Sequence, residues 1–206
     1  MMKLLFAPTS PFVRKVMVCA HLTGQADKIQ RLDSAAHPVR RDSRIAAHNP
    51  LAKVPTLILQ DGQVLYDSRV ICEYLASQAD AETIFPASGA DRWTALSRQA
   101  LGDGLLDAAL LARYELTARP PEFQWPTWRE ALLTKVTACL ASIETIASEL
   151  NHHQPTIGEI TIGCALGYLD FRFPELNWRA KCGIAAHWNE AFQSLPAMQA
   201  TQPCEV

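Results

Sequence analysis

The sequence predicts an α/β N-terminal domain followed by an all-α helical-bundle C-terminal domain. Short apolar runs with the character of β-strands occur only in the first part of the chain. A stretch of small and polar residues at 80–90 then interrupts the pattern, and beyond it apolar residues recur only with helical spacing. We therefore expect one domain at 1–79, a linker at 80–90 and a helical domain at 91–206.

Composition narrows the classes of partner. The chain has 206 residues, and 49% of them are hydrophobic, which is enough for well-packed cores. Its 19 Lys and Arg against 21 Asp and Glu give a net charge of -2, so no electrostatic argument favours nucleic acid or an anionic membrane as partner. The first residues do not form a signal peptide and no apolar run approaches a membrane span, so we expect a cytoplasmic protein.

The six cysteines are widely spread, without a C-x-x-C pair or a spacing that suits zinc. We expect them to be reduced, and most to be small buried side chains in helices. Cys204 is the one expected to be exposed.

The first residues predict a strand, a turn and a helix. Lys3–Ala7 is a short apolar run ended by Pro8, and helical spacing begins at Pro11. Ser10 suits the N-cap with proline as the first helical residue, and Gly24 suits the stop. One face of this helix carries the apolar residues Val13, Val16, Met17 and Ala20.

The stretch after this helix contains a weaker strand at Lys28–Leu32 and then a polar, Arg-rich segment up to His48. Periodicity leaves the structure of that segment open, with a short helix as one possibility. Two strands follow at Val54–Leu59 and Gln63–Tyr66, and the Asp61-Gly62 pair between them predicts a hairpin.

A third helix is expected after the hairpin, capped at Asp67 or Ser68. The side chains expected to face inward from it are Val70, Ile71, Tyr74 and Leu75.

The second half contains three strong helix patterns. A long amphipathic helix starts near Trp93, and another at Leu132–Leu150 is preceded by a capping box, Thr127-x-x-Glu130. A second box, Thr156-x-x-Glu159, precedes a segment that is apolar on nearly every side, which predicts a central buried helix. The apolar face of the first of these helices is expected to hold Trp93, Leu96, Ala100, Leu101, Leu105, Ala108 and Leu111.

Four short motifs follow one another along the chain in an order that is informative about the family. They are Thr9-Ser10-Pro11-Phe12-Val13-Arg14-Lys15, Asn49-Pro50-Leu51-Ala52-Lys53-Val54-Pro55-Thr56-Leu57, Leu65-Tyr66-Asp67-Ser68 and the Thr156-x-x-Glu159 box. With the order of elements, these motifs resemble the cytosolic glutathione transferase family over nearly the whole chain. The Ser-Pro-Phe start is most similar to the tau class and to small bacterial members related to the tau and omega classes. The omega class has Cys at the position of Ser10. Two positions depart from the family pattern: Ala52 stands where Gly is common, and Glu159 where Asp is usual.

The resemblance implies a thioredoxin-like N-terminal domain that binds glutathione, with no metal. Glutathione carries two carboxylates, one ammonium and a thiol whose pKa is about 8.5. The family pattern implies that Lys53 lies beside the glycyl carboxylate, Asp67 beside the γ-glutamyl ammonium, and Ser68 at the γ-glutamyl carboxylate. It also implies a cis Val54–Pro55 peptide that presents the Val54 backbone to the cysteinyl part of the ligand.

Ser10 is the residue that the resemblance makes catalytic, because its hydroxyl and the positive end of the helix dipole would both stabilise a thiolate. The expected glutathione-binding set is Ser10, Phe12, Lys53, Val54, Pro55, Asp67 and Ser68. The alternatives stay open. Ser10, Asp67 and Ser68 also suit plain helix caps, and Lys53 suits a solvated loop charge. Thr9 is the rival of Ser10 as the residue that holds the glutathione sulfur.

Other residues carry weaker signals. The adjacent pair His152-His153 lacks a Cys or carboxylate cluster and is interpreted as exposed loop, not as a metal site. Arg113, Tyr114, Trp125 and Trp178 would suit a pocket for a second substrate, and equally a core or dimer role.

The activity implied by the resemblance is that of a glutathione transferase, which activates the thiol for attack on an apolar electrophile, as in detoxification. A symmetric homodimer is the expected assembly. The alternative is a non-enzymatic interaction or regulatory protein that has kept the fold. Glutathione-dependent disulfide exchange would require a thiol where position 10 has Ser. The identity of the electrophile stays open.

Overall fold

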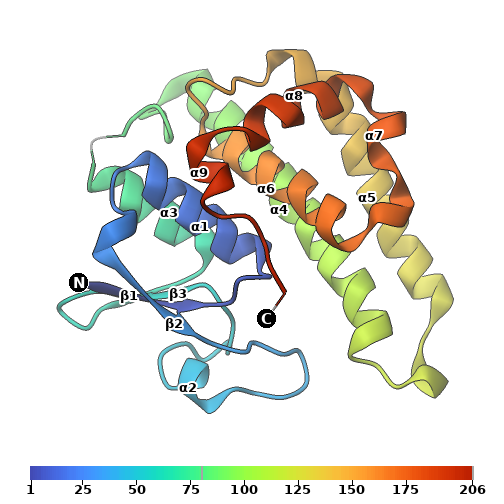
Figure 1. The fold of residues 1–206 in the computed structure, drawn as a ribbon, viewed down its shortest axis with the longest axis horizontal. Helices are drawn as coiled ribbons and strands as arrows, with labels where there is room; N and C mark the ends of the chain where they lie inside the picture. Colours follow the sequence, from blue (N-terminus) through green and yellow to red (C-terminus); the bar gives the residue numbers. More distant parts are fainter. Residues whose placement is uncertain (80, 206) are drawn as a thin grey trace. The chain divides into compact units, whose positions relative to one another are not determined.

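The computed structural model describes residues 1–79 and 81–205. They form two compact units, one of Met1–Ala87 with Pro196–Val206 and one of Ser88–Leu195. Strands occur in the first unit, and the described residues of the second unit are helical apart from their connections (Figure 1). The predicted fold class, α/β and then all-α, is confirmed.

A four-stranded sheet forms the centre of the first unit, in the order β2-β1-β3-β4. β1 and β2 are parallel, whereas β3 is antiparallel to both β1 and β4. Gly62, in the turn between β3 and β4, has a φ of 88°, which is the reason a glycine suits the predicted hairpin. The strands are β1 Met2–Phe6, β2 Ile29–Asp33, β3 Thr56–Ile58 and β4 Val64–Leu65.

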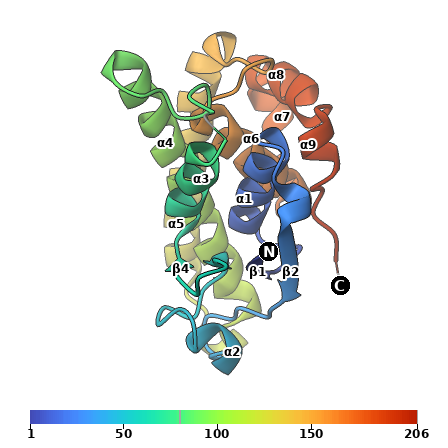
Figure 2. The ribbon, with the colours of Figure 1, turned by 90° about the vertical axis from the view of Figure 1, so that its left-hand side faces the viewer.

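Helices α1 and α3 pack together over the sheet, and α2 lies on the far side of the strands from them (Figures 1 and 2). The predicted apolar face of α1 is buried as expected. In α3 the prediction for Val70 is wrong: its side chain is 47% exposed, because the buried stripe runs along the face of Ser68, Ile71 and Leu75. The helices of this unit are α1 Pro11–Leu22, α2 Ser43–Ala46, α3 Ser68–Ser77, α9 Pro196–Gln199 and the 3-10 helix η1 Ala26–Lys28.

The end of the chain packs with the first unit, although the sequence had assigned it to the helical domain. α9 packs against α1, and the buried Arg14 guanidinium donates a hydrogen bond of 3.2 Å to the Met198 carbonyl. Burial of a charged side chain is tolerated when it is hydrogen-bonded, so this contact helps to hold the C-terminal segment in place. The predicted boundaries, with one domain at 1–79, a linker at 80–90 and a second domain at 91–206, remain a prediction.

The second unit is built around α6, which is buried along almost its whole length, as predicted. The Thr156-x-x-Glu159 capping box forms: the Thr156 hydroxyl accepts from the Gly158 N–H at 3.1 Å, and Glu159 accepts from the Thr156 N–H at 2.9 Å. Glu159 also pairs with Arg98 at 2.9 Å. The helices are α4 Gly89–Thr117, η2 Pro121–Phe123, α5 Pro126–Ile146, η3 Ala147–Glu149, α6 Ile157–Arg172, η4 Pro174–Leu176, α7 Trp178–Lys181 and α8 Gly183–Gln193.

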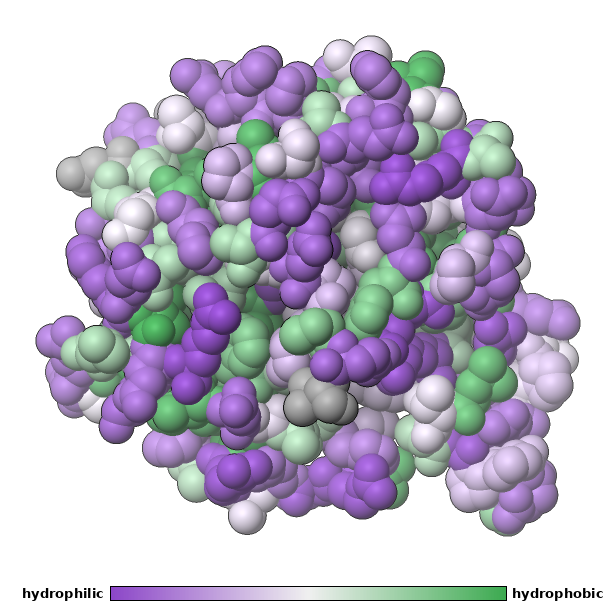
Figure 3. Space-filling view, in the orientation of Figure 1, coloured by the Kyte–Doolittle hydropathy of each residue, from purple (hydrophilic) through white to green (hydrophobic). Residues whose placement is uncertain are grey.

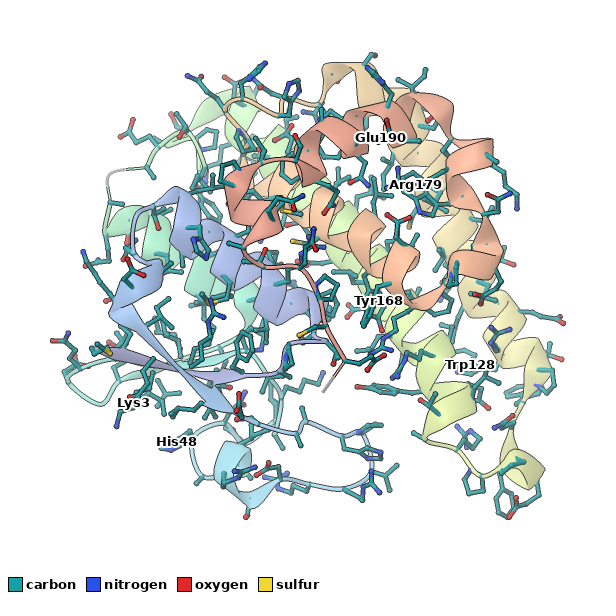
Figure 4. The ribbon with its side chains drawn as sticks, in the orientation of Figure 1. Lys3, His48, Trp128, Tyr168, Arg179 and Glu190 are labelled. Carbon is teal, nitrogen blue, oxygen red and sulfur yellow. The ribbon has the colours of Figure 1, made fainter. Side chains whose placement is uncertain are left out.

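Charged side chains join the later helices of this unit. Arg179 of α7 pairs with Asp170 of α6 at 2.7 Å and approaches Glu190 of α8 at 3.9 Å (Figure 4). The face of the molecule in Figure 3 is mostly hydrophilic, with apolar residues scattered among the charged ones. This is the ordinary surface of a folded chain.

The predicted start of α5 is wrong. The helix begins at Pro126, so Thr127 and Glu130 lie inside its first turns and form no capping box. Proline fixes φ at a value that suits the first helical position. Before it, the Trp125 N–H donates to the Glu115 carboxylate at 2.6 Å, and this hydrogen bond is the main reason that the pKa of Glu115 is lowered.

By length and mean hydropathy alone, Pro126–Glu149 would suffice to cross a membrane. A single such helix is weak evidence for a membrane span, because core helices of soluble bundles pass the same test. In this unit Leu132, Val136, Leu140 and Ile143 form a buried stripe along α5.

The predicted apolar face of α4 is only partly right. Leu105 and Ala108 are buried as predicted, but Ala100 is exposed. Trp93 and Leu111 are exposed, contrary to expectation, whereas Gly102 is buried. A Cβ at Gly102 would lie 2.8 Å from Thr161 Cγ2 and 3.1 Å from the Ile162 backbone nitrogen. The glycine therefore permits the close approach of α4 and α6 that buries α6.

We predict that Gly102→Ala lowers the free energy of unfolding by about 1–3 kcal/mol, because the added methyl group overpacks the contact between α4 and α6. Gly104→Ala is the matched control on the same helix, where an added Cβ meets nothing within 4 Å. That control should raise stability by about 0.5–1 kcal/mol through helix propensity. Urea denaturation measures both, and equal effects of the two substitutions would contradict the packing argument.

Candidate functional site

The sheet topology brings three connections of the first unit to one edge. β3 runs antiparallel to β1 with Leu5 opposite Thr56, and antiparallel to β4 with Leu57 opposite Leu65. The end of β1, the start of β3 and the end of β4 are therefore neighbours. Since adjacent strands lie about 4.8 Å apart, the connections after β1 and after β4 leave the sheet about 10 Å from each other. We call this edge the β1–β3–β4 edge.

Ser10 lies at this edge as the N-cap of α1. Its hydroxyl oxygen accepts from the Val13 N–H at 3.3 Å, and Pro11 is the first helical residue, as predicted. The hydroxyl proton of Ser10 has no acceptor among residues 1–79 and 81–205. A half-buried hydroxyl at a helix N-terminus can thus donate to an anion that binds beside it.

The loop before β3 is organised by a buried side chain, Asn49, which is 1% exposed. Its amide donates to Thr56 Oγ1 at 2.9 Å and to the Lys53 carbonyl at 3.3 Å, and its oxygen accepts from the Leu51 N–H at 2.9 Å. Thr56 Oγ1 in turn donates to the Lys53 carbonyl at 2.8 Å. These bonds fix the course of the backbone on both sides of Lys53.

Two backbone features of the loop agree with what the resemblance implies. The Val54–Pro55 peptide is cis, as predicted. Ala52 has a φ of 51°, a conformation that glycine adopts more easily than alanine, which gives a physical reason for Gly at this position in the pattern that the chain resembles. Neither the N–H nor the C=O of Val54 has a hydrogen bond within the part of the chain that the structure describes.

The Arg-rich segment before this loop forms the short helix α2. Asp42 caps it by accepting from the Arg44 N–H at 2.8 Å, and a side-chain hydrogen bond from Arg44 is the main reason that the pKa of Asp42 is lowered. Arg41 donates to the Pro50 carbonyl at 3.1 Å. The segment thus supports the loop that carries Lys53.

Asp67 and Ser68 form the third part of the edge, at the start of α3. Asp67 is the N-cap: its carboxylate accepts from the Arg69 N–H at 2.9 Å and lies 3.7 Å from Arg69 Nε. The peptide between Tyr66 and Asp67 is cis. Ser68 is only 3% exposed, yet its hydroxyl makes no hydrogen bond to any described residue.

Charges of both signs are available along the edge. The Lys53 ammonium is exposed and has no ion-pair partner in residues 1–79 and 81–205, and the Asp67 carboxylate is half exposed. The N-termini of α1 and α3 both begin at this edge, so the positive ends of two helix dipoles lie beside it. An extended ligand with carboxylates and an ammonium would meet an opposite charge at each end.

The other predicted residues have different places. Phe12 is half-buried on the first turn of α1, with Lys15 Nζ 5.8 Å from its ring centroid. Trp125 is exposed and Trp178 is buried, with its indole N–H donating to Asp170 at 2.8 Å. His152 and His153 lie in a loop, and the described residues contain no cluster of Cys, His, Asp and Glu that could hold a metal ion. The described cysteines are all free, and Cys204 is exposed, as predicted.

Comparisons with known proteins agree with this geometry. Residues 9–78 match the model of the glutathione S-transferase N-terminal domain. The chain is 32% identical over 180 residues to the GST-like protein YibF of Escherichia coli (strain K12), covering 86% of each chain.

The chain belongs to the glutathione S-transferase family. One similar crystal structure is that of a glutathione transferase family member from Pseudomonas fluorescens Pf-5 with bound glutathione. Its sequence is 42% identical to this one, and the two structures superimpose with a TM-score of 0.95 over 100% of both chains. A second structure from that organism holds S-(propanoic acid)-glutathione and superimposes with a TM-score of 0.91 at 42% identity over 99% of this chain and 100% of that chain. The thioredoxin-like character of the first unit is thereby confirmed.

Asn49 and Thr56 are parts of the edge that sequence reasoning did not assign a role. Both lie inside a motif that was recognised by resemblance, but the motif alone does not show that the two side chains bond to each other and to the Lys53 carbonyl. The available signal was Asn49 before Pro50, since Asn side chains often bond to the backbone two residues further on. The Leu51 N–H makes this bond here.

We predict that Asn49→Ala lowers the free energy of unfolding by about 2–3 kcal/mol, because it removes three hydrogen bonds and leaves buried groups unsatisfied. Asn151→Ala is the matched control: that exposed side chain accepts from the His153 N–H in the same way, at 2.8 Å. The control should cost less than about 1 kcal/mol. Urea denaturation compares the two, and equal losses would contradict the structural role of Asn49.

Proposed function

We propose that this family member binds glutathione at the β1–β3–β4 edge and activates its thiol for conjugation. The observation that carries the proposal is a set of polar groups that converge on one edge and have unused hydrogen-bonding capacity within the described chain. They are the Ser10 hydroxyl proton, the Ser68 hydroxyl, the Val54 backbone and the Lys53 ammonium. Glutathione bound to the relative from Pseudomonas fluorescens supports this choice of ligand.

The dimensions of the edge suit a tripeptide. Three extended residues span about 10 Å, which matches the two strand spacings between the connections after β1 and after β4. The γ-glutamyl end lies at α3, where Asp67 meets the ammonium and the Ser68 hydroxyl and helix N-terminus meet the carboxylate. Lys53 meets the glycyl carboxylate. The free N–H and C=O of Val54 pair with the backbone of the cysteinyl residue, as in an added strand.

This arrangement leaves the cysteinyl sulfur at the N-terminus of α1. The Ser10 hydroxyl donates its proton to the sulfur in a hydrogen bond, which is stronger when the sulfur is a thiolate. The helix dipole acts in the same sense, so both effects lower the thiol pKa from its ordinary value of about 8.5. Thr9, whose hydroxyl has no hydrogen bond within the described residues, is the rival donor.

The proposed reaction is nucleophilic. The thiolate forms a carbon–sulfur bond with an electrophilic carbon of a mostly apolar co-substrate, and the electron pair leaves on a leaving group or is protonated after addition. A relative that holds S-(propanoic acid)-glutathione supports a role in chemistry at the sulfur. The proposal includes a detoxifying role, a cytoplasmic site of action and a homodimer, with glutathione as co-substrate rather than resident cofactor.

The second candidate is a binding protein that has kept the fold for regulation. It needs no hydroxyl donor for the sulfur, so the available proton of Ser10 favours the enzyme. Glutathione-dependent disulfide exchange is not favoured, because the α1 N-cap has no thiol.

We predict that Ser10→Ala lowers the conjugation rate about 10- to 100-fold near neutral pH and changes glutathione affinity much less. The charged groups hold the ligand in both protonation states of the thiol, whereas the hydroxyl favours the thiolate. Raising the pH through about 8.5 should partly rescue the variant, because solvent then supplies the ionisation. The measurement is a rate assay over a panel of aryl halides, isothiocyanates and epoxides, from pH 6 to 9.

Thr9→Ala is the control and should keep most of the activity. Loss of activity in Thr9→Ala with full activity in Ser10→Ala would move the sulfur donor to Thr9. Tight glutathione binding by the wild-type protein without conjugation of any electrophile in the panel would favour the regulatory alternative.

A further inference from the structure

Helices α4 and α6 of the second unit run parallel, and their glycine contacts fix the register. Gly158, at the start of α6, faces Ala95 and Arg98 of α4, and Gly102 faces Thr161 and Ile162. The second contact joins Gly102 of α4 to Thr161 of α6. Three helical turns, about 11 residues, further along each helix lie Arg113 on α4 and Arg172 on α6. The C-terminal ends of the two helices therefore bring these residues to the same height, and both views show the helices side by side (Figures 1 and 2).

Aromatic side chains surround the two arginines. Tyr168 lies one turn before Arg172 on α6, as labelled in Figure 4, and its ring centroid is 6.3 Å from that of Phe173. The Arg172 guanidinium lies over the Phe171 ring, 4.0 Å from its centroid. Tyr114 adjoins Arg113 on α4. We call Arg113, Tyr114, Tyr168 and Arg172 the α4–α6 cluster.

The members of the α4–α6 cluster influence one another's pKa values, in agreement with the register of the two helices. The pKa of Tyr168 is raised to about 12, mainly by burial. The charge of Arg113 opposes the rise, Tyr114 adds to it, and the charge of Arg172 opposes it. Burial likewise raises the pKa of Tyr114, against the nearby charge of Arg113. Both phenols are thus protonated at neutral pH and act as hydrogen-bond donors.

Much of the donor capacity of the cluster is unused. Tyr168 is only 4% exposed, yet its hydroxyl has no hydrogen bond in residues 1–79 and 81–205. The same is true of the Tyr114 hydroxyl, and the Arg113 guanidinium has neither a hydrogen bond nor an ion pair to a described residue. A nearly buried hydroxyl without a partner is uncommon in folded proteins. Arg113, Tyr114 and Arg172 are half-buried, so part of each side chain is exposed to solvent.

Acidic residues near the cluster in sequence have other partners. Glu115 is held by Arg119 at 2.9 Å and by the Trp125 N–H, and Asp170 is held by Arg179 and by the Trp178 indole. The cluster therefore combines the positive charge of Arg113 with two phenolic donors, Tyr114 and Tyr168. This donor set, bordered by aromatic rings, is complementary to a single carboxylate attached to an apolar body.

We propose that the α4–α6 cluster binds the carboxylate of a small, largely apolar organic acid. Arg113 offers two parallel N–H groups to the two carboxylate oxygens, the Tyr168 and Tyr114 hydroxyls donate further hydrogen bonds, and Phe171 and Phe173 border the apolar part. This site goes beyond the proposed function, because it lies within the second unit and requires neither glutathione nor Ser10.

Calorimetric titration of the full chain tests this site with benzoate as the probe, and with benzamide, which has the same shape without the charge. Benzoate should bind at least about 10-fold more tightly than benzamide. Arg113→Met should lose at least about 10-fold in benzoate affinity, and Tyr168→Phe, which removes only the hydroxyl, about 3- to 10-fold. Arg40→Gln, at an exposed arginine of the first unit, is the control and should bind benzoate as the wild type does.

Three outcomes would overturn the proposal: equal binding of benzoate and benzamide, unchanged benzoate affinity in both Arg113→Met and Tyr168→Phe, or tighter binding of inorganic phosphate than of benzoate. Titration of benzoate is then repeated with glutathione at saturation. If glutathione abolishes benzoate binding and Arg113→Met also weakens glutathione affinity, the carboxylate is that of glutathione and the separate site is wrong. Because the benzoate titrations without glutathione involve no conjugation, failure of the proposed enzyme activity leaves their result unaffected.

Discussion

The antiparallel pairing of β3 with both of its neighbours is the constraint on which the candidate site depends. Because β3 lies between β1 and β4 and runs against both, the segment that enters β3 must meet the segments that leave β1 and β4. Two of these connections start helices, so the same pairing aligns two helix N-termini with one edge. A parallel β3 would send Lys53 to the opposite edge and separate it from Ser10 and Ser68.

Packing below this edge keeps the connections in place. Asn49 and Thr56 fix the loop around Lys53 by buried hydrogen bonds, so Val54 presents its backbone groups without using them in the fold. Ser68 is fixed by burial, although its hydroxyl has no partner among the described residues. Binding groups that are positioned before the ligand arrives lose little conformational entropy on binding, which favours affinity. The second unit depends on a different contact, the close approach of α4 and α6 at Gly102.

The order of strands and helices up to α6 could be predicted from the sequence because apolar periodicity and turn residues are local signals, whereas α7, α8 and α9 were not predicted. Pro11, Gly62 and the Thr156-x-x-Glu159 box each mark a boundary that the structure confirms. The start of α5 could not be predicted correctly, because Thr127-x-x-Glu130 imitates a capping box and the deciding contact, from the Trp125 N–H to Glu115, joins residues ten positions apart. The site was predicted only by resemblance.

Burial was harder to predict where packing partners are distant in sequence. The apolar pattern of α4 favoured Trp93 and Leu111, but both are exposed, since α6 approaches along a face of small residues. Val70 is exposed for a related reason, because α3 packs through Ile71 and Leu75. The unused donors of Tyr168 and Arg113 have no sequence signal, because they depend on the register of two helices far apart in the chain.

An NMR titration of the isotope-labelled full chain with glutathione is the most direct test of the central claim that three connections form one binding edge. We predict that the backbone amide signals of Thr9, Ser10, Phe12 and Val13, of Lys53 and Val54, and of Ser68 and Arg69 shift together and follow one common dissociation constant. A glutathione-dependent shift confined to one connection, or found only in residues of the second unit, would contradict the account.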